Sequence, residues 1–83
     1  PARLSYKDQR ELDGLPDRIA ALEKEIAALE ANLADAGLYA RDALVAEAAM
    51  RRHAAAKGEL DAAEQRWLEL EERRAALAPD ARA

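Results

Sequence analysis

The sequence predicts an all-α fold, an antiparallel two-helix coiled-coil hairpin with a short N-terminal helix packed near its open end. Ala, Leu, Glu, Arg and Lys dominate the 83 residues, while Phe and Cys are absent, a composition typical of coiled coils and long helices. Apolar residues recur at steps of three and four along two stretches that Gly37 separates. An elongated pair of helices also suits a chain too short to build a large round core.

The first element is predicted to be a short helix over residues 5–13. Ser5 and Asp8 have the spacing of a capping box, in which the serine oxygen accepts a backbone N–H three residues later. Gly14 would end this helix, because glycine adopts a left-handed conformation readily. Pro16 would then begin the next helix, where its missing N–H would be unpaired in any case.

A long helix is predicted over residues 16–36, a turn over 37–42 and a longer helix over 42–77. Heptad spacing keeps one row of side chains, here called the seam, facing a single partner helix. Asp42 is a suitable N-cap for the last helix, and Pro79 stops it, so that residues 78–83 are expected to fray. The short N-terminal helix would cover the surplus length of the last one. The seam positions are Leu15, Ile19, Leu22, Ile26, Leu29 and Leu33, then Ala46, Ala49, His53, Ala56, Leu60, Ala63, Trp67, Leu70, Arg74 and Leu77.

A fold-back at residues 37–42 aligns the two seams when facing residue numbers sum to 82. Branched side chains then face alanines, so that large and small partners complement each other layer by layer. Charged residues beside the seam also meet opposite charges, which selects the register more than it stabilises the fold. The seam pairs are Leu33–Ala49, Leu29–His53, Ile26–Ala56, Leu22–Leu60, Ile19–Ala63 and Leu15–Trp67, and the flanking pairs are Arg18–Glu59, Glu25–Arg52, and Glu23 or Glu30 with Lys57.

The alternative is a homodimer in which the interruption at Gly37 is a stutter in one continuous helix. A parallel dimer would place each alanine layer against itself and leave it underfilled. Short connections also favour antiparallel neighbours. The hairpin is therefore preferred, and we expect it to be monomeric.

Composition and motifs exclude several functions. Without cysteine there is no disulfide framework or thiolate metal site, and the chain has no phosphate-binding loop, no zinc-protease motif and no cluster of histidines. His53 on the seam is interpreted as a packing residue, because a ligand or general base ordinarily needs partners. No window approaches the ~20 apolar residues of a membrane span. We therefore expect no catalytic residue, no metal and no membrane contact, and a cytoplasmic location.

Charge is distributed unevenly along the chain. The net charge is −4, which argues against strong autonomous binding of nucleic acid. From Ala36 to Gly58, however, four bases outnumber two acids, whereas from Glu59 to Glu72 six acids face one base. A basic tip touching phosphate is therefore one interpretation, and flanking salt bridges are the other. The bases in question are Arg41, Arg51, Arg52 and Lys57.

Two aromatic residues also have two interpretations each. Trp67, opposite Leu15, is most simply a core anchor, and a stacking platform for bases is the alternative. Tyr39 lies in the predicted turn, where it would either pack over the hairpin end or contact a partner.

Three stretches carry a resemblance to a known family. They are LSYKDQREL ahead of GLP, the turn segment DAGLY, and RWLELEE near the C-terminal end. With the heptads between them, they make nearly the whole chain similar to the C-terminal coiled-coil domain of the ABC-F ATPases, most closely those of the Uup-like group. The first residue is Pro1 instead of Met, so we expect this chain to be a piece of such a protein.

The resemblance implies two ATP-binding cassettes ahead of the coiled coil, with ATP and magnesium bound there and no cofactor in this segment. It also implies action on ribosomes or nucleic acid, and a hairpin that binds DNA. Any contact of this chain with DNA or ribosomal RNA would involve Lys7 and Arg10, or the bases near the tip, and would be weak and salt-dependent. The second hypothesis is a protein-contacting or spacer coiled coil that touches no nucleic acid.

Overall fold

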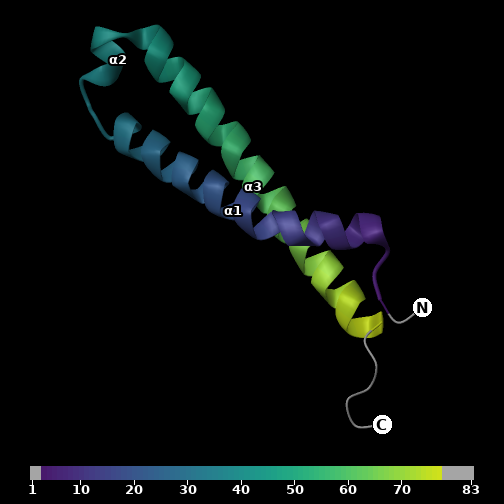
Figure 1. Cartoon of the computed structure of the whole chain (residues 1–83). Helices are drawn as coiled ribbons and strands as arrows, with labels where there is room; N and C mark the ends of the chain where they lie inside the picture. The colour runs from purple at the N-terminus through teal and green to yellow at the C-terminus, as the bar shows by residue number, and fades with distance from the viewer. Residues whose placement is uncertain (1–2, 78–83) are drawn as a thin grey trace.

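Two long helices run in opposite directions and are joined at one end by a short helical segment (Figure 1). The computed structural model describes residues 3–77, and within them the helices are α1 (Tyr6–Leu33), α2 (Leu38–Arg41) and α3 (Ala43–Leu77). The chain measures 65 × 22 × 14 Å along its principal axes. The predicted all-α hairpin is confirmed, and the continuous helix of the homodimer alternative is wrong, because α1 ends at the interruption and α3 returns beside it.

The predicted break between residues 13 and 16 is wrong. Ser5 caps a helix as expected, its hydroxyl oxygen accepting the backbone N–H of Asp8 at 3.1 Å, but that helix continues through Gly14 and Pro16 to Leu33. Gly14 does not adopt a positive φ. Local residue preference is overridden here because Leu12 and Leu15, on either side of Gly14, are both buried against α3, and a continuous helix keeps both on the core face.

Pro16 nevertheless leaves a mark on α1. Proline lacks the N–H that would bond to the carbonyl oxygen four residues earlier, and its ring crowds that carbonyl, so a proline within a helix bends it. The N-terminal part of α1, purple in Figure 1, departs from the direction of the remainder and lies across α3. This part covers the surplus length of α3, the role that was predicted for a separate short helix.

The chain reverses at the tip, defined here as residues 34–42. α1 ends at Leu33, three residues before the predicted boundary, and α2 occupies most of the predicted turn. Asp42 caps α3 as expected, because its side chain accepts the N–H of Val45 at 3.1 Å and its carbonyl accepts that of Ala46 at 3.1 Å. The predicted helix over 42–77 therefore begins within one residue of its expected start. The expected fraying of residues 78–83 lies outside the described residues.

The core is one row of apolar residues from both helices, extended at the open end by Leu4 from the segment before α1. Two features confirm the predicted register. Seam positions of α1 and α3 pack in a single cluster, with alanines supplying the small partners, and the flanking pairs Arg18–Glu59 and Glu25–Arg52 both form. The buried members of the cluster are Leu4, Leu12, Leu15, Leu22, Ile26, Ala56, Ala63 and Leu70, and Ile19, Leu60 and Leu77 pack against them.

Trp67 is not the core anchor that the seam predicted. Its side chain is 37% exposed, whereas Leu70, one turn further along α3, is completely buried. Because α1 continues past Gly14, Leu12 and Leu15 fill the core at this level together with Leu70. The indole is left at the edge of the seam, where it lines a surface groove beside Pro16.

Candidate functional site

Three ion pairs form a ladder along one side of the hairpin. Arg52 donates to Glu25 through Nε at 2.6 Å and Nη2 at 2.7 Å, and through Nη1 to Glu59 at 2.9 Å. These bonds hold the pKa of the Glu25 carboxyl below its ordinary value and raise the pKa of the Arg52 guanidinium. Arg52 is therefore engaged in the flanking salt bridge that was one of its two predicted roles. The ladder consists of Glu11–Arg66, Arg18–Glu59 and Glu25–Arg52.

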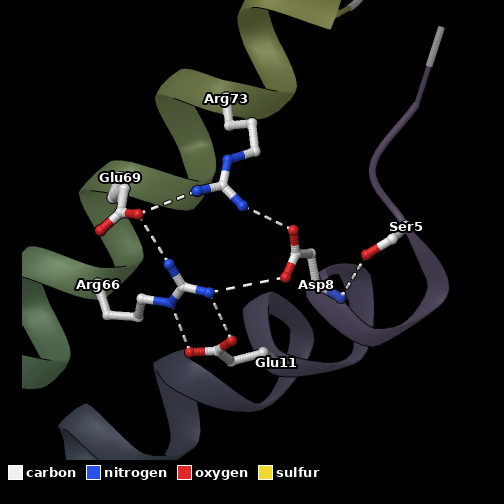
Figure 2. Close-up of polar contacts among 6 residues, drawn as sticks. All are labelled: Ser5, Asp8, Glu11, Arg66, Glu69 and Arg73. Carbon is white, nitrogen blue, oxygen red and sulfur yellow. Dashed lines mark hydrogen bonds and ion pairs between the residues drawn. The ribbon is translucent and has the colours of Figure 1, made fainter. Parts of the chain in front are cut away.

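Six residues at the open end form a polar network that fixes the N-terminal part of α1 on α3 (Figure 2). Arg66 donates two hydrogen bonds to Glu11, at 2.7 and 2.9 Å, and Arg73 donates to Asp8 at 2.7 Å. Both arginines also donate to Glu69, and the Asp8 side chain is only 17% exposed. The bond from Arg66 lowers the pKa of the Glu11 carboxyl. The network thus adds polar contacts to the packing that holds the first turns of α1 against α3.

Lys7 and Arg10, the candidates on the first turns of α1, both lie on the surface at this open end. Arg10 donates to the hydroxyl oxygen of Tyr6 at 3.1 Å, and its guanidinium lies 5.7 Å from the centre of that ring. Tyr6 is itself 76% exposed. The pair is thus an exposed cation stacked on an exposed aromatic, a combination that can contact nucleic acid.

At the tip, Arg41 has an acidic partner that the sequence did not reveal. Its guanidinium bonds to the Asp35 carboxylate, which also accepts the backbone N–H of Gly37 at 3.0 Å. The bond from Arg41, followed by that from Gly37, lowers the pKa of the Asp35 carboxyl. A β-carbon at residue 37 would lie 2.7 Å from the Arg41 guanidinium, so glycine leaves room for this pair.

Tyr39 is 55% exposed at the tip, and its hydroxyl donates to Glu47 on α3 at 3.1 Å. Its ring lies against the surface, near Leu33 and Met50. The hydroxyl thus ties the tip to α3, and contact of the exposed part of Tyr39 with a partner stays a prediction.

Arg51 and Lys57 are exposed on α3, and neither forms an ion pair with residues 3–77. The expected contact of Lys57 with Glu23 or Glu30 is therefore wrong. Glu30 bonds instead to the ring nitrogen Nε2 of His53 at 2.9 Å. His53 is a partly buried seam residue, as its position predicted, and its contact with Glu30 was not predicted.

The candidate residues are not gathered at one place on the hairpin. Tyr39 and Arg41 lie on α2 at the tip, Lys7 and Arg10 lie near the open end, and the remaining candidates lie on α3. Those on α3 are Arg51, Arg52 and Lys57. Over residues 3–77, no group of histidine, aspartate and glutamate side chains is arranged to hold a metal ion. No helix in the same range is both long and apolar enough to cross a membrane.

The stretches LSYKDQREL, DAGLY and RWLELEE all lie on this antiparallel hairpin, which is the fold that the family resemblance implies. Residues 3–72 match the family model described as ABC transporter C-terminal domain, and the chain belongs to that family. The predicted resemblance is thereby confirmed at the level of the family, and the segment is a C-terminal domain of this class of ATP-binding proteins.

The chain also matches individual proteins, three of which are described here. The chain is 46% identical over 77 residues to ATP-binding protein Uup of Caulobacter vibrioides, covering 93% of this chain and 13% of that protein. It is 39% identical over 72 residues to ATP-binding protein Uup-like of Haemophilus influenzae, covering 87% and 16%. An uncharacterized ABC transporter ATP-binding protein, YfmR of Bacillus subtilis, is 46% identical over 68 residues, covering 82% and 10%.

The chain therefore spans between a tenth and a sixth of the length of these relatives. No solved structure gave a significant match.

Sequence reasoning missed the ladder pair Glu11–Arg66 and the contact of Arg73 with Asp8. A signal for the first was present, because Glu11, Arg18 and Glu25 recur every seven residues, and their partners on α3 do the same. It was overlooked because the long helix was expected to begin only at Pro16. The pairing of Arg41 with Asp35 depends on the shape of the tip and has no comparable signal.

Proposed function

We propose that this chain is the nucleic-acid-binding module of an ABC-F type ATPase, contacting DNA or ribosomal RNA through the tip of the hairpin. Arg51 carries the proposal, because it is an exposed cation without an ion pair among residues 3–77. Arg41 and Tyr39 accompany it on α2, where Arg41 is paired with Asp35 but keeps 62% of its side chain exposed. Phosphate contacts need accessible cations, and Arg52, held by two glutamates, offers less to a ligand than Arg51 does.

The ATPase part of this proposal is based on the relatives of the chain, which are named ATP-binding proteins. ATP and magnesium would bind in cassettes outside this chain, and the hairpin would position those cassettes on nucleic acid in the cytoplasm. Contact should be weak, because the chain has a net charge of −4. Lys7 and Arg10 at the open end, and Lys57 on α3, would give secondary contacts.

Fluorescence anisotropy with labelled duplex DNA, single-stranded DNA and a ribosomal RNA fragment, each at two salt concentrations, tests the proposal. The variant Arg41→Glu with Arg51→Glu should bind more weakly than the parent. The slope of log affinity against log salt should fall by up to about two, one for each phosphate that is no longer neutralised. The double variant Lys24→Glu with Arg74→Glu changes the net charge equally but away from the tip, and it is the matched control.

Equal weakening by both double variants would show that only net charge matters and would contradict contact at the tip. Absence of binding by the parent at low salt would favour the second function, a protein-contacting module. Trp67 and Leu68 supply a specific observation for that function, because both are large apolar side chains and are 37% and 52% exposed.

A further inference from the structure

A shallow groove of about 590 Å³ runs between the two helices at the level of the bend in α1. Pro16 and Ile19 form its α1 wall, and the opposite wall comes from Glu64, Gln65, Trp67 and Leu68 of α3. Trp67 and Leu68 present their exposed surfaces here. An apolar depression with polar residues at its edge is typical of an interaction site.

The two sides of the hairpin differ in chemistry. The ladder residues directly precede seam positions, whereas Pro16 and Glu64 directly follow them, so the ladder and the groove lie on opposite sides of the seam. On the ladder side the acids and bases neutralise each other across the seam. Among the exposed large apolar residues of α3, Trp67 and Leu68 lie nearest the open end, and both line the groove.

The groove side is acidic. Residues seven apart lie on the same side of a helix in this coiled coil. On the groove side, Pro16 of α1 is therefore followed by Glu23 and Glu30, and Glu64 of α3 lies between Lys57 and Glu71. Glu71 is paired with Arg74, and Glu30 bonds to the ring of His53, which carries a charge only when it is protonated. Glu23 and Glu64 form no ion pair with residues 3–77, and Asp61, seven residues before Leu68, accepts a hydrogen bond only from uncharged Gln65. The groove side therefore carries three carboxylates without an ion pair, Glu23, Asp61 and Glu64, and only one lysine, Lys57, among residues 3–77.

The negative charge of the groove side indicates which kind of molecule can bind there. A second copy of the chain would bring carboxylates against carboxylates, which is repulsive, and nucleic acid would bring phosphates against them. A partner with basic residues beside an apolar stripe satisfies both features. The groove lies between two helices, and a third helix can pack its side-chain ridges into such a channel.

We propose that this groove binds a cationic amphipathic helix of a partner protein, with the partner's apolar face on Trp67 and Leu68 and its lysines or arginines near Glu23, Asp61 and Glu64. This surface is separate from the tip, so it does not depend on nucleic-acid binding. The hairpin would then hold nucleic acid at one end and a protein along its flank.

Trp67 is the only tryptophan of the chain, so its fluorescence reports on the groove directly. The probe is a synthetic 18-residue amphipathic helix of leucine and lysine, with a matched peptide carrying glutamate in place of lysine. The lysine peptide should shift the Trp67 emission to shorter wavelength with a saturable titration. The glutamate peptide should bind at least about fivefold more weakly, since like charges oppose it.

Two variants test the two components of the site. Leu68→Gln removes apolar surface and should weaken binding about fivefold or more, whereas Glu64→Lys should weaken it about two- to fivefold and reduce its salt dependence. Leu44→Gln makes the same leucine-to-glutamine change in the first turn of α3, far from the groove, at a position that is 77% exposed. This control variant should bind like the parent. Circular dichroism of each variant establishes that the helices are intact.

Equal binding of both peptides, or unchanged affinity in folded Leu68→Gln, would overturn the proposal. A shift of Trp67 emission with chain concentration alone would also overturn it, because the occupant would then be a second copy. Loss of nucleic-acid binding in the tip variant Arg41→Glu with Arg51→Glu should leave peptide binding intact, so the two functions can fail separately.

Discussion

Arg52 forms a bidentate pair with Glu25 across the hairpin, its Nε and Nη2 donating to the two carboxylate oxygens at 2.6 and 2.7 Å. The residue numbers of this pair sum to 77, and so do those of Arg18–Glu59 and Glu11–Arg66. The signs alternate along each helix. A slip by seven residues would therefore set Glu25 against Glu59 and place arginine against arginine, so the ladder specifies one register.

Charge reversal tests that specification. Glu25→Arg alone, or Arg52→Glu alone, should lower the melting temperature, because each places like charges within the ladder. The two changes together should recover part of the loss, since the pair is restored in reverse. Thermal unfolding followed by circular dichroism measures all three, and Arg51→Glu, next to the ladder but outside it, should melt like the parent. A double variant no more stable than the worse single one would contradict a direct pairing.

Acidic pH should lower the stability of the hairpin. Hydrogen bonds from arginines lower the pKa of Glu11 and Glu25 from an ordinary value of 4.5, and that of Asp35 from 3.8. A carboxyl with a lowered folded-state pKa stabilises the fold above its unfolded-state pKa, and this contribution is lost as pH falls through the folded-state value. The melting temperature should therefore decline below about pH 4.5 as these groups take up protons.

The double variant Glu11→Gln with Glu25→Gln is the control for this decline. It should be less stable than the parent at pH 7, and the difference should shrink as the pH falls below about 4.5. A constant difference between neutral pH and about pH 3 would show that these two carboxylates are not responsible.

Leu70 should be among the most costly residues to truncate. It is completely buried in the cluster that also holds Leu12 and Leu15, and removing a buried leucine side chain to alanine costs about 2–5 kcal/mol. Chemical denaturation of Leu70→Ala should give a loss in this range. Leu68→Ala, two residues away and half exposed, should change the free energy of unfolding by less than about 0.5 kcal/mol. Similar losses at both positions would contradict this assignment of the core face.

Two glycines lie inside long helices without a structural need for glycine. A β-carbon at Gly14 or Gly58 would meet no atom within 4 Å, and neither residue has a positive φ. Alanine should therefore stabilise the hairpin by about 0.5–1 kcal/mol at each position. Urea unfolding of Gly14→Ala and Gly58→Ala measures this gain. Destabilisation by Gly14→Ala would indicate that α1 is interrupted there after all.

The fold was largely predictable because heptad spacing is a strong signal and the pairing of branched residues with alanines has one consistent register. Asp42, Ser5 and the flanking pair Arg18–Glu59 followed from local chemistry or from that register. The predicted helix break at Gly14 and Pro16 was wrong because local residue preference and tertiary packing disagree there. The packing of Leu12 and Leu15 on α3 keeps the helix continuous. Few of the candidate contacts were predictable, since the partners of Arg41 and Trp67 depend on the tip and on the bend.

The central claim is that one chain folds back on itself, and small-angle X-ray scattering of the purified 83-residue chain tests it most directly. The hairpin predicts a mass near 9.1 kDa, a radius of gyration near 18.6 Å and a maximum dimension close to 65 Å. Twice that mass, with a maximum dimension above about 100 Å, would contradict the fold-back. A single continuous helix over most of the chain would reach about that length, because an α-helix rises about 1.5 Å per residue.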